Sequence, residues 1–282
     1  MSRHPADPDT AWLVAGRAAA MAVGPERALA SHPDVRGRVH LAEPVPDLGP
    51  VLTEHRVAES GVRSFTVPWH SLADGRTVAA HPVSGNQVLW RADAPTDLGV
   101  TASSHGHLTA VHVRFLLRHL TTRLLEEDLA GRSIHAVAAA SGAGVLAVAG
   151  PTRSGKTRLV NHLVAAGLIG AVVDDDCPVL APGGVLGMLV PTRYEVTRAV
   201  CLPMRTLVLL SEEATSVQQV DGAAAQRFLG STARPWPASW LPGDFTRVLP
   251  DLPDLPADLT VIAAPAQAES AFESIAGLVK AG

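Results

Sequence analysis

The residues with the clearest chemical potential are the eight consecutive ones at 150–157, which read GPTRSGKT. They fit the pattern G-x-x-x-x-G-K-[ST] of loops that bind nucleotide phosphates. In such a loop the backbone N–H groups converge on the phosphates, and the N-terminus of the following helix adds its positive end. We therefore predict ATP binding here, with Gly150 and Gly155 in backbone conformations that a Cβ atom would forbid.

Two side chains of this segment have predicted roles of their own. Lys156 would neutralise the β- and γ-phosphates, and Thr157, on the first helical turn, would offer its hydroxyl to Mg²⁺. The pattern thus predicts ATP and Mg²⁺ as cofactors. The predicted nucleotide ligands are Gly150, Pro151, Thr152, Arg153, Ser154, Gly155, Lys156, Thr157 and Arg158.

Three carboxylates, Asp174, Asp175 and Asp176, follow Lys156 by 18 to 20 residues. That spacing fits one helix and one strand, and parallel pairing of this strand beside the first would bring its tip to the phosphate loop. Adjacent carboxylates repel one another unless a cation lies near, which favours a metal-bearing site over the alternative, a solvated acidic turn. Cys177, directly after the run, is interpreted as a small buried residue and not as a nucleophile.

His135 is expected inside an apolar strand, 134–140. A buried imidazole needs a hydrogen-bond partner, so the residue is either a core histidine or a group that holds one of the aspartates in place. Both interpretations remain open from the sequence.

The elements expected to position these residues alternate in a regular way. Apolar runs and glycines predict a strand, a glycine-rich turn, a second strand, the phosphate loop, a helix that stops at Gly167, and a strand that ends in the acidic run. The expected ranges are strands at 134–138, 145–149, 171–173, 206–210 and 259–263, and helices at 155–166 and 266–280.

The first part of the chain shows different patterns. Residues 1–30 fit one amphipathic helix, 34–107 read as short strands separated by turn formers, and 108–129 return to helical spacing. We therefore predict two domains, 1–107 and 108–282, and a mixed α/β fold.

The composition narrows the classes of partner. The 282 residues include Lys+Arg 23 and Asp+Glu 27, a net charge of -4 that gives no general attraction to nucleic acid or an anionic membrane. The apolar stretch 12–23 is interrupted by Arg17 and fits neither a signal peptide nor a membrane span. Cys177 and Cys201 are too few for a disulfide scaffold. We expect a cytoplasmic protein with no nucleic-acid or membrane partner; homo-oligomerisation is left open.

The segments IHAVAAASGAGVLAVAGPTRSGKTRLVNHLVAAG and VVDDDCPVL resemble the catalytic core of the HPr serine kinase-like proteins, which share a fold with phosphoenolpyruvate carboxykinase. The resemblance covers roughly 108–210. It implies a P-loop kinase core of that type, and a kinase that transfers the γ-phosphoryl group of ATP to a hydroxyl, with a serine of a peptide or protein as acceptor.

Carried over by position, the resemblance implies that Asp175 is the base, His135 and Lys156 complete the catalytic set, and Thr157 and Asp176 contact Mg²⁺. The third aspartate leaves the pair Asp174 and Asp175 as another register. The family commonly has glycine where Arg153 stands, and the first third of the chain does not match the accessory domain of bacterial HPr kinase, so the shorter relatives associated with peptide modification are the nearer comparison.

The sequence leaves two other functions open. A small-molecule kinase of the shikimate or gluconate type also places aspartates after its loop, but such chains begin with the loop's strand, whereas Gly150 lies mid-chain. A nucleotide-gated binding protein would turn over ATP slowly or not at all.

Overall fold

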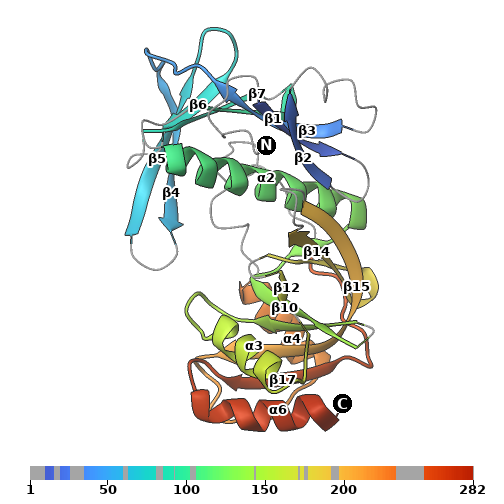
Figure 1. Ribbon diagram of the computed structural model, residues 1–282. Coiled ribbons are helices and arrows are strands. Elements are labelled where there is room, and N and C mark those ends of the chain that lie inside the picture. Colours follow the sequence, from blue (N-terminus) through green and yellow to red (C-terminus); the bar gives the residue numbers. More distant parts are fainter. Residues whose placement is uncertain are drawn as a thin grey trace. The chain divides into compact units, whose positions relative to one another are not determined.

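The protein is described by a computed structural model (Figure 1). It describes residues 10–15, 20–25, 35–59, 63–80, 85–91, 93–101, 106–142, 144–170, 172–174, 177–191, 197–232 and 251–281. The fold is mixed α/β. The chain divides into two compact units, one of residues 1–123, 192–198 and 237–248, the other of 124–191, 199–236 and 249–282. The division falls inside a helix, later than the boundary expected at 107.

The first unit is built on an eight-stranded sheet in the order β2-β1-β3-β8-β7-β6-β5-β4. Neighbours with printed registers are antiparallel except β3 and β8, which are parallel. The prediction of a β-rich section is confirmed, and so is the helix that follows it. The bounds are β1 Thr10–Ala15, β2 Ala20–Pro25, β3 Val35–Ala42, β4 Val51–Glu59, β5 Arg63–Ser71, β6 Thr77–Ala80, β7 Gln87–Arg91, β8 Ala94–Thr101 and α2 Gly106–Leu129.

The amphipathic helix predicted within residues 1–30 is wrong. The described part of that range forms the antiparallel strands β1 and β2, with Trp12 opposite Val23. β1 also pairs with β3, which lies further along the chain. A short apolar run fits a helix or a strand equally well by spacing alone, and here a distant strand supplies the hydrogen-bond partners.

The second unit contains the residues with predicted catalytic or binding roles, and it is built on a nine-stranded sheet. The main path is β12-β10-β11-β15-β14-β13-β9, and β17 pairs with β15 and β16. The bounds are β9 Arg132–Ser133, β10 Ala136–Ser141, β11 Gly144–Ala149, α3 Lys156–Ala165, β12 Val172–Asp174, β13 Val179–Ala181, η1 Pro182–Gly184, β14 Val185–Pro191, β15 Thr197–Ser211, β16 Gln218–Gln219, α4 Gly222–Thr232, β17 Thr260–Pro265, η2 Glu269–Ala271 and α6 Phe272–Ala281.

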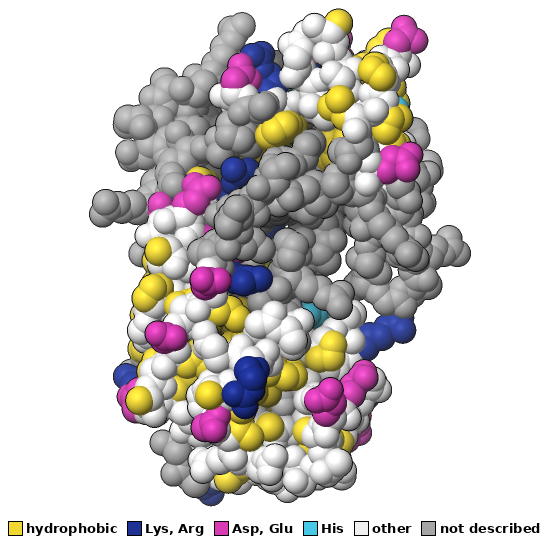
Figure 2. All heavy atoms as spheres, turned by 180° about the vertical axis from the view of Figure 1, so that it is seen from behind, with side chains coloured by type: hydrophobic (Ala, Val, Ile, Leu, Met, Phe, Trp, Pro, Cys, Tyr) yellow, Lys and Arg dark blue, Asp and Glu magenta, His cyan; other side chains and the backbone are white. Residues whose placement is uncertain are grey.

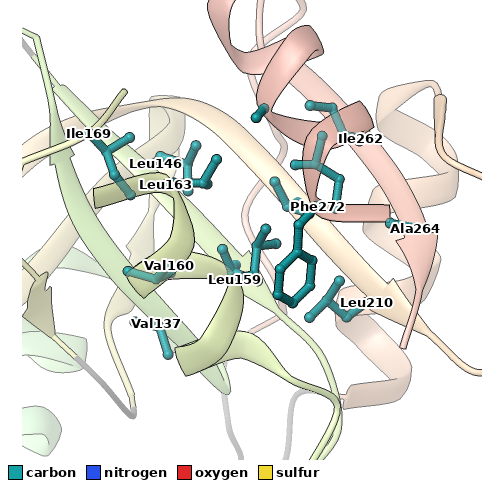
Figure 3. Close-up of a cluster of buried hydrophobic side chains, with 14 of the residues drawn as sticks. Val137, Leu146, Leu159, Val160, Leu163, Ile169, Leu210, Ile262, Ala264 and Phe272 are labelled. Carbon is teal, nitrogen blue, oxygen red and sulfur yellow. The ribbon is translucent and has the colours of Figure 1, made fainter. Parts of the chain in front are cut away.

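The central strands of this sheet are apolar on both faces, because both faces are covered. Side chains alternate along each strand, so one set of β10 and β11 residues packs with α3 and α6 (Figure 3), and the other set packs with β13, β14 and α4. Phe272 lies close to Leu159 and Leu210 in the cluster formed with α3 and α6. The loop between β11 and α3 therefore starts and ends on elements that are packed into the same core.

The charged side chains are mixed in sign on the face drawn in Figure 2, where described Lys and Arg groups alternate with Asp and Glu groups. No helix in the described part of the chain is long and apolar enough to cross a membrane.

Candidate functional site

The glycine-rich segment lies between β11 and α3, as the sequence predicts. Helix α3 begins at Lys156 after Gly155, which has φ 97° and ψ 10°. This left-handed conformation is one that glycine adopts without steric cost. The helix ends at Ala165, and the expected stop residue, Gly167, follows the C-cap Ala166 with φ 69°. Gly167 donates its N–H to the Val164 carbonyl, and Leu168 donates its N–H to the Leu163 carbonyl. This pair of bonds is the Schellman motif.

Gly150 is required because a Cβ atom would not fit at this position, and not because of a left-handed backbone conformation. Its φ is not in the left-handed region. Instead, a Cβ at this position would lie 2.6 Å from Ser154 Oγ and 2.8 Å from the Leu210 carbonyl oxygen. Ser154 is itself 2% exposed. The first glycine therefore allows the two ends of the loop to approach each other over β15.

The side chain of Lys156 bonds back to the loop that precedes it. Its ammonium donates to the carbonyl oxygens of Gly150, at 3.0 Å, and Pro151, at 2.9 Å, and the residue is 7% exposed. A buried ammonium has to be hydrogen-bonded, and here loop carbonyls meet part of that need. The cation is thus held beside the backbone that would cradle a phosphate.

A contact missed by the sequence analysis sets the direction of one loop amide. The Ser154 carbonyl accepts a hydrogen bond of 2.8 Å from the backbone N–H of Gln267, which follows β17. In a trans peptide the carbonyl and the next N–H point in opposite directions, so the Gly155 N–H points away from residue 267. Gln267 has φ 59°. Nothing in its residue type signals this role, which depends on β17 pairing beside β15.

The other predicted ligands of the loop lie at its surface. Thr152, Arg153, Thr157 and Arg158 are exposed. Arg158 forms an ion pair of 3.0 Å with Glu269, and both side chains are largely in solvent, so the pair adds little stability. Thr157 is exposed on the first turn of α3, the position from which its hydroxyl is predicted to meet Mg²⁺.

Arg153 has φ 67°, which is left-handed and unfavourable for a side chain with a Cβ by roughly 1–2 kcal/mol. We expect Arg153→Gly to relieve this strain, offset by about 0.5–1 kcal/mol of added chain entropy in the unfolded state. The free energy of unfolding should therefore rise by about 1 kcal/mol or less, measured by denaturant titration. ATP affinity should stay within about tenfold, measured by calorimetry.

Arg153→Ala is the matched variant, since it removes the guanidinium and keeps the strained backbone. If both variants lose more than about tenfold in ATP affinity, the Arg153 side chain belongs to the phosphate-binding site and the expectation is wrong.

His135 lies beside the loop, but not inside a strand as predicted. It occupies a bend before β10, which begins at Ala136, and it is partly exposed. Its carbonyl oxygen accepts the Gly150 N–H at 3.4 Å, and the preceding residue, Ile134, donates its N–H to Pro178 at 3.0 Å. The backbone around residue 135 thus contacts both the start of the loop and the segment that follows the acidic run.

The strand that leads to the acidic run does not lie directly beside β11. β12 pairs antiparallel with β10, which in turn pairs antiparallel with β11, so Ala138 is opposite both Asp174 and Ala147. The prediction of direct parallel pairing is wrong because the hairpin β10–β11 places β10 in that position. β12 and β11 still run in the same direction, and their tips lie at the same edge, two strand spacings or roughly 10 Å apart.

Asp174 is the only residue of the acidic run among the described residues, and it is 4% exposed. Its Oδ1 accepts the Cys177 N–H at 3.3 Å, which links the two residues on either side of Asp175 and Asp176. Cys177 is 3% exposed, so its interpretation as a small buried residue is confirmed. Asp175 and Asp176, the predicted base and metal ligand, lie outside the described residues. Within the described residues, no group of three or more His, Cys, Asp or Glu side chains gathers at a metal-binding distance.

A scan against protein-family models finds no match, and a search of curated proteins finds none either. The class that the fold defines is a mixed α/β protein whose glycine-rich loop joins a strand to a helix.

Proposed function

We propose that the chain is an ATP- and Mg²⁺-dependent phosphotransferase that moves the γ-phosphoryl group to the hydroxyl of a peptide or protein serine. The observation that carries this proposal is the arrangement of the loop 150–157 between β11 and α3, with the Lys156 ammonium held against its carbonyls. The acidic run begins at the same edge of the sheet.

Several features of the loop support the proposal that it binds a triphosphate. The Gly155 N–H points away from residue 267, and the N-terminus of α3 adds further donors with a partial positive charge. Lys156 would exchange its carbonyl partners, at least in part, for β- and γ-phosphate oxygens. The Thr157 hydroxyl, exposed on α3, would ligate Mg²⁺ together with Asp176. A bound Mg²⁺ would neutralise charge on the phosphates and fix their orientation.

In the proposed reaction Asp175 accepts the proton of the acceptor hydroxyl. The freed oxygen bonds to the γ-phosphorus, and the bond from that phosphorus to the bridging oxygen breaks, so that ADP leaves. His135 is assigned as a positioning residue, because its backbone contacts the loop and its neighbour Ile134 contacts Pro178, just beyond the acidic run. The resemblance to HPr serine kinase-like proteins supports serine as the acceptor.

The direct test is ADP release by the purified chain in Mg-ATP, with and without a serine-containing peptide. We expect release to rise with the peptide, to depend on Mg²⁺, and to match incorporation of phosphate into the peptide. The same peptide with alanine in place of serine is the control.

Two outcomes would contradict the proposal. ADP release that is indifferent to every acceptor would indicate a nucleotide-gated binding protein. Release stimulated by polyhydroxy acids such as shikimate or gluconate, and not by peptides, would indicate a small-molecule kinase.

A further inference from the structure

Strand β4 lies at one end of the sheet of the first unit (Figure 1). It pairs with β5 on one side, and none of the described strands pairs with its other side. Three exposed large hydrophobic residues lie at or just before its start: Leu48 at 37%, Val51 at 50% and Leu52 at 59%. A nine-residue edge of this kind is a template for pairing with another chain.

Two charged residues in the middle of β4, Glu54 and Arg56, have no opposite charge across the sheet, whereas Glu59 at its end is opposite Arg63. In the register with β5, Glu54 is opposite Pro68 and Arg56 is opposite Thr66. Charged residues on an edge strand usually oppose pairing with another edge. In β4, however, one acidic and one basic residue flank His55 symmetrically.

This symmetry makes the strand complementary to itself in one antiparallel register. With two copies related by a twofold axis at His55, Glu54 of each copy is opposite Arg56 of the other. A twofold at Glu54 would place glutamate opposite glutamate, and a twofold at Arg56 would place arginine opposite arginine. Opposite charges in directly paired positions stabilise a sheet and like charges destabilise it, so the charges select the register centred on His55.

We propose that the edge of β4 with which none of the described strands pairs is the docking surface for a second copy of this chain, and that the two sheets join antiparallel across a twofold axis at His55. The inference is independent of the nucleotide site.

The test is sedimentation velocity over a wide range of protein concentration. We expect the wild-type chain to dimerise reversibly. Glu54→Arg and Arg56→Glu should each raise the dimer dissociation constant about tenfold or more, since either change replaces two opposite-charge pairs by two like-charge pairs. The double variant should restore dimerisation. Glu212→Arg, the same charge change at an exposed position of the other unit, should have no effect.

A mixture of the two single variants separates pairing between copies from effects within one strand. Glu54→Arg and Arg56→Glu chains should form a mixed dimer with each other, although neither dimerises well alone. A wild-type chain that stays monomeric would overturn the proposal, as would a dimer insensitive to the single changes. A correctly folded double variant that fails to dimerise would do the same, with circular dichroism as the check on folding.

Discussion

Lys156→Ala is expected to lower phosphoryl transfer by a factor on the order of 10² to 10³ or more, since developing charge on the transferred group then loses its cationic partner. In the structure this ammonium bonds the Gly150 and Pro151 carbonyls at 3.0 and 2.9 Å. No other cation is anchored to the carbonyls of this loop among the described contacts. Transfer to a serine-containing peptide, measured by phosphate incorporation at saturating Mg-ATP, is the readout.

The controls for this variant address charge and folding separately. Lys280→Ala removes an exposed lysine near the end of α6 and should leave transfer unchanged. Lys156→Met keeps most of the aliphatic stem without the charge, so it tests the ammonium even if the alanine variant unfolds. A folded Lys156→Met protein with undiminished transfer would remove the basis for the nucleotide site.

Asp175→Asn is expected to lower turnover by a factor on the order of 10² or more while ATP binding changes little, because the amide keeps the shape of the side chain and loses its basicity. Asp176→Asn should weaken the dependence on Mg²⁺ as well as turnover. Asp174→Asn should be nearly silent, because its Oδ1 accepts the Cys177 N–H and an amide oxygen can accept the same bond.

The three variants are compared by phosphate transfer across a Mg²⁺ series, with nucleotide affinity measured in parallel. If Asp174→Asn is the most damaging in turnover while its thermal stability is unchanged, the catalytic pair is Asp174 and Asp175. If all three leave transfer unchanged, the acidic run is a solvated turn and the phosphotransferase proposal fails.

Short-range patterns predicted several elements correctly. The hairpin of β10 and β11, the glycine-rich loop, helix α3 and its end at Gly167 all depend on contacts between residues near in the chain. The predicted strand at 206–210 lies inside β15, which extends over Thr197–Ser211, and 259–263 nearly coincides with β17. The closing helix predicted from 266 begins as η2 at Glu269 and continues as α6 from Phe272.

Contacts between segments far apart in the chain determined the features of the fold that the sequence did not predict correctly. β1 and β2 became strands because β1 pairs with β3, although the spacing of their apolar residues also fits a helix. The position of β12 beside β10 and the bond from Gln267 to Ser154 likewise join residues far apart in the chain. Such pairings depend on which strands meet in the sheet, and no local preference encodes that choice.

By itself, the sequence determined where a glycine-rich loop would join a strand to a helix, because glycines and a lysine at fixed spacing between the two elements constrain the local backbone directly. Only the tertiary structure shows that Gly150 is needed because Ser154 and Leu210 approach it closely, and not because it has a left-handed φ. It also decided the direction of the Gly155 amide and the separation of Asp174 from β11 by two strand spacings. The physical reason is that packing and strand pairing act across long stretches of chain, whereas propensity and capping act within a few residues.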